Sequence, residues 1–195
     1  MYRNHNRKIN FAGDTMAKTI KIISVISVAL TFICGTLYYF TALGFLLTIA
    51  IIFGTTAYHL LMRLAVGWII NLFLKNYVNY HKKWFNVSER ELKLYKKLKV
   101  RKWKNNMPTY DSSFFDSKAH SWEEIAQAMC QAEIVHEVIV VLSFLPILAY
   151  IPFGALGVFI ITSLLSACFD MMFVIMQRYN RPRIIKLINK RKSDT

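Results

Sequence analysis

The chain alternates between long apolar runs and shorter polar segments. Runs of close to twenty mostly apolar residues cover about 22–40, 45–62, 132–150 and 155–176. At a rise of 1.5 Å per residue, a helix of about twenty residues crosses a hydrocarbon core of about 30 Å. The pattern therefore predicts an all-α polytopic membrane protein with about four transmembrane helices and additional amphipathic cytoplasmic helices. The expected regions are a basic cytoplasmic tail at 1–21, a transmembrane hairpin at 22–62, a basic interfacial or cytoplasmic segment at 63–131, a second transmembrane hairpin at 132–176 and a basic cytoplasmic tail at 177–195.

The central segment carries signals for helices that do not cross the membrane. Residues 64–85 mix lysines with tryptophan and tyrosine, which is typical of a helix lying along the membrane interface, although 64–74 can also prolong the second span. Ser88 and Glu91 have the spacing of a capping box at a helix start. A loop is expected over 109–120. Ser121 then caps a helix that continues into the third span, where Pro146 predicts a kink.

The charge distribution predicts how the chain is oriented. Its formal net charge is +14, and the two predicted turns at 41–44 and 151–154 contain no lysine or arginine. The positive-inside rule then places both termini and the central segment in the cytoplasm of a multi-pass cell membrane protein. No nucleic-acid-binding module accompanies the positive charge, so nucleic acid is not an expected partner. The three scattered cysteines predict no disulfide framework.

One cluster of ionisable residues lies at the start of the third apolar run. Glu133, His136 and Glu137 share one face of the predicted helix. A carboxylate beside an imidazole orients the ring and raises its basicity, so Glu133 and His136 are a candidate general-base pair. Two other interpretations remain open: a metal site, for which Glu-x-x-His supplies two ligands, and a polar helix start at headgroup level. A second such motif is missing, so we expect no metal.

Two further polar clusters are candidates for substrate binding. The first follows the fourth apolar run as Gln177-Arg178-Tyr179-Asn180-Arg181-Pro182-Arg183, and the second is Val100-Arg101-Lys102-Trp103-Lys104. Arginine guanidinium groups bind phosphate or carboxylate in a bidentate manner, and tryptophan among cations suits lipid headgroups. The first cluster can also be a positive-inside anchor that only stops translocation, and the second can be a solvated basic face. Asp170, two turns before the first cluster, is expected to pair with an arginine or a neighbouring span in a structural role.

Three blocks of this sequence resemble one known family. They are Val100-Arg101-Lys102-Trp103-Lys104, Ala132-Glu133-Ile134-Val135-His136 and Gln177-Arg178-Tyr179-Asn180-Arg181-Pro182-Arg183. Their order and spacing, over about 84–185, resemble the bacterial glycosyl-4,4'-diaponeurosporenoate acyltransferases of the staphyloxanthin pathway. The chain departs from the family pattern at Glu137, where the pattern has tryptophan, and this marks Glu137 as a possible modulator of substrate choice.

The resemblance implies a membrane-bound O-acyltransferase that moves a fatty acyl chain to a sugar hydroxyl of a glycolipid, such as a glycosylated carotenoid. It implies His136 as the base and Glu133 as the residue that orients it. The substrate-binding residues would be Arg101, Lys102, Trp103, Gln177, Arg178, Tyr179, Asn180, Arg181 and Arg183. The implied partners are membrane lipids, a glycolipid acceptor and an acyl donor such as acyl-CoA, which is a co-substrate, so no tightly bound cofactor is expected.

Other classes of protein also fit the residue pattern. A non-enzymatic lipid-binding or membrane assembly protein would explain the basic surface without using His136. A small membrane methyltransferase would need a soluble nucleotide-like donor, but the sequence has no glycine-rich phosphate loop. A channel is disfavoured because the charges gather at one membrane face instead of lining several spans at depth.

Overall fold

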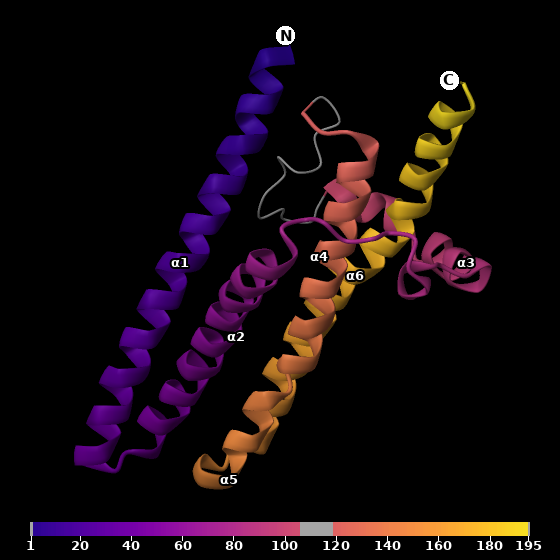
Figure 1. The fold of residues 1–195 in the computed structure, drawn as a ribbon. Helices are drawn as coiled ribbons and strands as arrows, with labels where there is room; N and C mark the ends of the chain where they lie inside the picture. The colour runs from indigo at the N-terminus through magenta and orange to yellow at the C-terminus, as the bar shows by residue number, and fades with distance from the viewer. Residues whose placement is uncertain (1, 106–118, 195) are drawn as a thin grey trace.

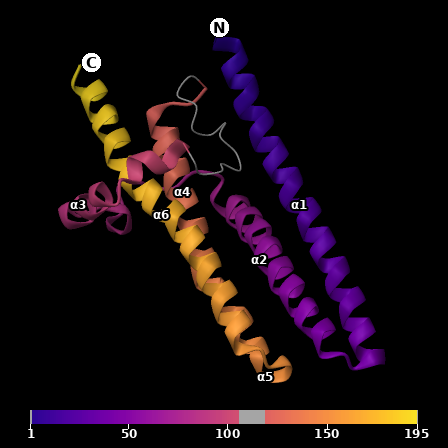
Figure 2. The same ribbon diagram turned by 180° about the vertical axis from the view of Figure 1, so that it is seen from behind.

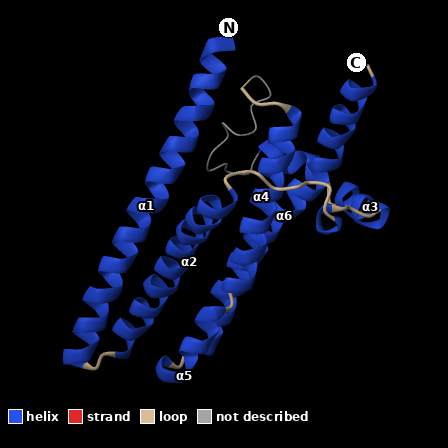
Figure 3. Ribbon diagram, in the orientation of Figure 1, coloured by secondary structure: helices blue, strands red, loops and turns tan. Residues whose placement is uncertain are grey.

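The computed structural model describes residues 2–105 and 119–194, with side chains described over 18–103 and 119–194. Within these ranges it consists of helices joined by loops and turns, without strands, as the sequence predicts (Figure 3). The elements are α1 (Tyr2–Thr41), α2 (Gly44–Leu74), η1 (Lys83–Phe85), α3 (Glu89–Lys97), η2 (Val100–Asn105), α4 (Trp122–Leu142), η4 (Leu145–Ala149), α5 (Tyr150–Phe153) and α6 (Leu156–Ser193). Most of the loop expected over 109–120 lies outside the described residues.

Four helical segments are long and apolar enough to cross a membrane, which confirms the predicted fold class. They are Lys18–Thr41, Gly44–Leu74, Trp122–Phe153 and Leu156–Ser193. Their outer faces carry exposed large apolar side chains such as Phe32, Phe73 and Leu165, as expected where a helix meets lipid. The two basic segments expected as tails are mostly helical in the structure. At the N-terminal end α1 begins at Tyr2, and at the C-terminal end α6 continues through Pro182 to Ser193.

The helices form two hairpins that pack side by side. α1 packs on α2, α4 packs on α6, and α2 contacts both α4 and α6 (Figures 1 and 2). The α1–α2 turn and α5 lie at one end of the bundle, and both chain termini lie at the other (Figure 1). In consequence α2 and α6 run in the same direction, and α4 runs against both.

The segment after α2 differs from its prediction. The alternative that 64–74 prolong the second span is confirmed, because α2 continues to Leu74. The interfacial helix expected further on, to residue 85, is wrong: left-handed backbone at Lys75 (φ 46°) and Asn76 (φ 62°) ends α2. Residues 77–82 are irregular, and η1 follows. Phe85 of η1 and Val78 pack against α4 and α6, with Ala126 and Ile188 in the same apolar cluster. This segment therefore crosses the ends of two helices instead of lying free along a membrane.

Local capping signals are confirmed. The Ser88 hydroxyl accepts from the Glu91 backbone N–H at 3.2 Å, and the Glu91 carboxylate accepts from the Ser88 N–H at 2.8 Å. Ser121 and Glu124 form the same capping box at the start of α4. The break expected near Pro146 is also present, because α4 ends at Leu142 and Pro146 lies in the first turn of η4. These signals could be recognised because they depend on a few neighbouring residues.

Candidate functional site

The centre of the polar interior is Asp170 of α6, which is fully buried. Its Oδ1 lies 2.9 Å from Nδ1 of His136 on α4. Its Oδ2 accepts from Arg63 of α2, at 3.0 Å from Nε and 2.5 Å from Nη2. An ionised carboxylate only accepts hydrogen bonds, so Nδ1 of His136 is the donor, and in the neutral ring Nε2 then carries the lone pair.

The His136 ring is held on two sides. It stacks on Phe173, with ring centroids 4.5 Å apart and planes at 7°. Its side chain keeps 22% of its surface exposed, and within the described part of the chain no group hydrogen-bonds to Nε2. A fixed imidazole with an available Nε2 is the arrangement that general-base catalysis requires.

Arg63 and two serines complete this inner cluster. Arg63 donates from Nη1 to the backbone carbonyl of His59 at 3.0 Å and from Nη2 to the Ser166 hydroxyl at 2.8 Å. The Ser166 hydroxyl lies 2.9 Å from that of Ser143 on α4. The Arg63 cation neutralises the Asp170 carboxylate, so this buried pair carries no net charge.

A second, outer cluster lies about two turns further along α6. Glu133 is fully buried and accepts from Arg178 at 2.7 Å and from Arg181. Arg178 also donates to Glu91 of α3 at 2.9 Å. Arg181 is fully buried, donates to the backbone carbonyl of Phe85 and lies over the Phe85 ring. Two acids and two arginines thus join α3, η1, α4 and α6 with no net charge.

Glu91 is half-buried and is the most accessible member of this outer cluster, and its ionisation depends on its partners. Burial by itself would raise the pKa of Glu91, but hydrogen bonds from the Ser88 backbone N–H and from Arg178 outweigh it and hold the pKa below its ordinary value. The ionised form of Glu91 therefore helps to fix α3 to α6.

The structure rearranges the predicted catalytic pair. His136 lies in the inner cluster, where its partner is Asp170 and not the expected Glu133, which is bound to Arg178 and Arg181. Asp170 pairs with an arginine and a neighbouring span, as expected, and it also contacts His136. Glu137 accepts from the Trp84 indole N–H at 3.0 Å.

The predicted substrate-binding residues divide into buried and exposed sets. Three of them are buried and one is half-buried: Gln177, Tyr179 and Arg181, and then Asn180. The Arg178 guanidinium already has four hydrogen-bond partners, which are the carboxylates of Glu91 and Glu133 and the backbone carbonyls of Trp84 and Asn86. Arg183 is exposed, and its guanidinium carbon Cζ lies over the Tyr179 ring, 4.4 Å from the ring centroid. Arg101 and Lys102 are exposed, and Trp103 packs against the cluster of Tyr95, Val100 and Tyr179. The structure therefore leaves Arg101, Lys102 and Arg183 as the accessible cations of this set.

Sequence reasoning missed Arg63. It follows an apolar run directly and so has the pattern of a stop-transfer cation, yet it faces inward. The available signal was the pairing of one arginine and one aspartate, each isolated in an apolar span, because such groups need a partner in a membrane.

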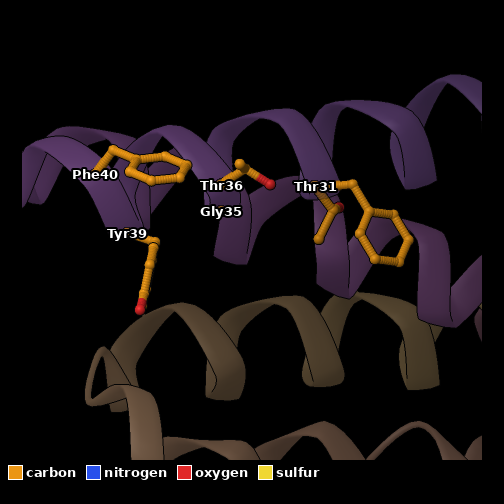
Figure 4. A pocket seen from close by; sticks show the side chains of 6 residues that line it. Thr31, Gly35, Thr36, Tyr39 and Phe40 are labelled. Atoms are coloured by element: carbon orange, nitrogen blue, oxygen red, sulfur yellow. The ribbon is translucent and has the colours of Figure 1, made fainter.

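A separate hollow lies on the surface of α1. It has a volume of about 390 Å³ and is lined by Thr31, Phe32, Gly35, Thr36, Tyr39 and Phe40 (Figure 4). It shares no residue with the inner or the outer cluster. In the part of the chain that the structure describes, no three His, Cys, Asp or Glu side chains gather as a metal site would require.

The fold and the site together define a class: a helical protein with four helices long and apolar enough to cross a membrane and with an Asp170–His136 dyad in its interior. The comparison with family models gives the family. Residues 80–190, more than half of the chain, match the model of glycosyl-4,4'-diaponeurosporenoate acyltransferase, and the chain belongs to this family. It is therefore an acyltransferase of carotenoid biosynthesis. No curated protein and no solved structure matches the chain.

Proposed function

We propose that this protein transfers a fatty acyl chain to a sugar hydroxyl of a membrane glycolipid, with a glycosylated carotenoid as the acceptor that the family description favours. The observation that carries the proposal is the 2.9 Å contact between His136 Nδ1 and Asp170, which leaves Nε2 as a base. Both reactants are apolar at one end, so a site within a helical membrane bundle reaches them where they partition.

The reaction proceeds by general-base catalysis. His136 Nε2 takes the proton of the sugar hydroxyl as its oxygen attacks the acyl carbonyl carbon. The tetrahedral intermediate then collapses, the bond to the donor's leaving group breaks, and the imidazolium returns the proton to that group. Asp170 holds the ring in the required tautomer and stabilises the imidazolium. Arg63 holds the Asp170 carboxylate in place through two hydrogen bonds.

The outer cluster has a positioning role in this scheme. Glu133 lies one turn before His136 on α4 and binds Arg178 and Arg181 of α6. It therefore fixes α4 against α6 and does not orient the His136 ring. Because these two arginines are already neutralised, the phosphate groups of a donor such as acyl-CoA would bind the exposed Arg101, Lys102 and Arg183, with Trp103 beside them. The acyl group arrives already activated, so the chemistry needs no tightly bound cofactor.

The distribution of basic residues supports a cytoplasmic location for this site. All lysines and arginines lie in residues 1–21, 63–131 and 177–195, and both termini lie at the same end of the bundle (Figure 1). His136 and Asp170 are only five and seven residues along the chain from the borders of these basic ranges. By the positive-inside rule, the end of the bundle with both termini lies on the cytoplasmic side of a bacterial cell membrane. Acyl donors made in the cytoplasm would reach it directly.

Comparison of cellular lipids by mass spectrometry tests the proposal. Lipids are extracted from cells that make the glycosylated acceptor together with the wild-type protein, the His136→Ala variant or neither. We expect a product heavier than the acceptor by one fatty acyl group in the wild-type sample alone. The absence of such a product, with the acceptor and the protein both present, would contradict the proposed reaction.

A further inference from the structure

Two polar side chains in the interior, those of His59 and Ser163, have no role in the proposed transfer reaction. His59 of α2 is 6% exposed, and neither of its ring nitrogens has a hydrogen-bond partner among residues 18–103 and 119–194. Ser163 of α6 is fully buried, and its hydroxyl likewise has no partner in these ranges. Buried polar groups are nearly always hydrogen-bonded, so two unpaired ones close to a reaction centre need an explanation.

The surrounding contacts place His59 and Ser163 at one level of the bundle. The Tyr58 hydroxyl donates to the Leu142 carbonyl at 2.8 Å, which brings this turn of α2 against α4. The next residue of α4, Ser143, reaches Ser166 of α6 at 2.9 Å. Thus α2, α4 and α6 meet here.

This level lies deeper in the bundle than the dyad. Arg63, one turn after His59, bridges to Ser166 and Asp170. Because α2 and α6 run in the same direction, His59 and Ser163 both precede this bridge. Ser163 is seven residues before Asp170, a separation of about 10 Å along the helix axis.

The charge at this level selects the kind of ligand. Arg63 and Asp170 neutralise each other, so there is no spare cation for an anionic group and no spare carboxylate for a cation. A neutral imidazole and a hydroxyl each supply one donor hydrogen. Two donors match the two lone pairs of a carbonyl oxygen.

We propose that His59 and Ser163 bind the carbonyl oxygen of the lipid acceptor, about 6 to 10 Å deeper in the bundle than the His136–Asp170 contact. This inference rests on the proposed function, because the acceptor is a reactant of that transfer. The acceptor can supply such a carbonyl through the ester that the name glycosyl diaponeurosporenoate indicates, whereas the carbonyl of the donor's acyl group is the reacting group and belongs beside His136. The ester carbonyl of the acceptor is not a reacting atom, so its binding affects KM more than kcat.

Steady-state kinetics of the purified full-length protein in proteoliposomes test this site. His59→Phe and Ser163→Ala each remove one donor, and KM is measured separately for acyl-CoA and for the glycosylated acceptor. We expect about a tenfold increase in KM for the acceptor and none for acyl-CoA, with kcat nearly unchanged, since a neutral hydrogen bond has about this effect. His59→Gln, which keeps a donor, should restore much of the loss. The matched control is Thr55→Val, one turn earlier on α2, which removes only intrahelical hydrogen bonds to the carbonyls of Ile51 and Ile52.

Thermal unfolding adds a readout that a purely structural histidine would not give. His59→Phe removes an unpaired buried polar group, so we expect Tm to stay equal or to rise while KM rises. Wild-type KM for both substrates in His59→Phe and Ser163→Ala would overturn the proposal. A fall in Tm of His59→Phe together with unchanged kinetics in His59→Gln and Ser163→Ala would equally overturn it.

A binding measurement separates this inference from the proposed transfer reaction. In the His136→Ala background, a glycosyl ester of a long-chain carboxylic acid, labelled with ¹³C at its ester carbonyl, is followed by NMR as a probe that needs no turnover. We expect a downfield carbonyl shift on binding, and loss of that shift when His59→Phe is added. A bound probe whose carbonyl shift does not depend on His59 overturns the inference and leaves the proposed transfer reaction untouched.

Discussion

Replacing Asp170 by asparagine changes the hydrogen bonding of the dyad while keeping the shape of the side chain. The carboxylate accepts from Arg63 on one oxygen and from His136 on the other. An asparagine has only one acceptor oxygen. If that oxygen stays on Arg63, the amide N–H₂ faces Nδ1 of His136, and the ring must shift its proton to Nε2. The base is then blocked in the wrong tautomer.

The expected loss of activity is large. An asparagine in place of the aspartate of a hydrolase triad lowers kcat by about 10⁴, which is about 5 kcal/mol of transition-state stabilisation, and the same tautomer argument applies to Asp170→Asn. The variant also leaves Arg63 without a counterion in the interior, which costs about 3–5 kcal/mol of stability. We therefore expect a lower Tm in addition to the lower rate.

The assay is the initial rate of transfer of an isotope-labelled fatty acyl group from acyl-CoA to the glycosylated acceptor in proteoliposomes. Rates are compared at a temperature well below the Tm of each protein, so that unfolding does not contribute. Asp194→Asn, an exposed carboxylate at the end of α6, is the matched control and should keep the wild-type rate. A folded Asp170→Asn protein that retains more than about a tenth of the wild-type rate would refute the role given to Asp170.

Three further predictions concern the outer cluster and the segment that crosses it. Glu133→Gln leaves the buried arginines without their shared carboxylate, so unfolding in detergent should show a loss of about 3–5 kcal/mol, and an unchanged Tm would contradict this. Trp84→Phe removes the indole N–H that donates a hydrogen bond to Glu137. Because Trp84 is exposed, we expect the free energy of unfolding in detergent to fall by less than about 1 kcal/mol. Glu91→Gln should lower Tm most near neutral pH. Because the pKa of Glu91 is lowered in the folded protein, its contribution is present above its unfolded pKa and is lost as pH falls through the folded value, so the Tm difference from wild type should vanish in acid.

The helical bundle could be predicted from sequence because each span carries its own signal. An apolar run of membrane length and a capping box are both local patterns. The segment after α2 was mispredicted for a related reason: its composition suits an interfacial helix, but the left-handed residues Lys75 and Asn76 end α2, and packing of Phe85 between α4 and α6 then determines its path. That packing depends on residues far away along the chain.

The candidate site could be located from sequence but not assembled. Glu133 and His136 are three residues apart on one helix, which made them the natural pair, whereas the actual partner of His136 is 34 residues away on another helix. Which acid reaches the ring is decided by how α4 packs on α6. Glu133 is turned to Arg178 and Arg181, and Asp170 is left for His136. Arg63 completes the site from a third helix, and no local pattern marked it.

The most direct test of the account is the acyl-transfer rate of His136→Ala in proteoliposomes, compared with the wild-type protein at equal amounts of folded protein. If Nε2 of His136 is the base, the rate should fall by about a hundredfold to ten-thousandfold, while KM for both substrates changes little. A His136→Ala rate within about threefold of wild type would contradict the central claim, because the transfer would then proceed without the imidazole.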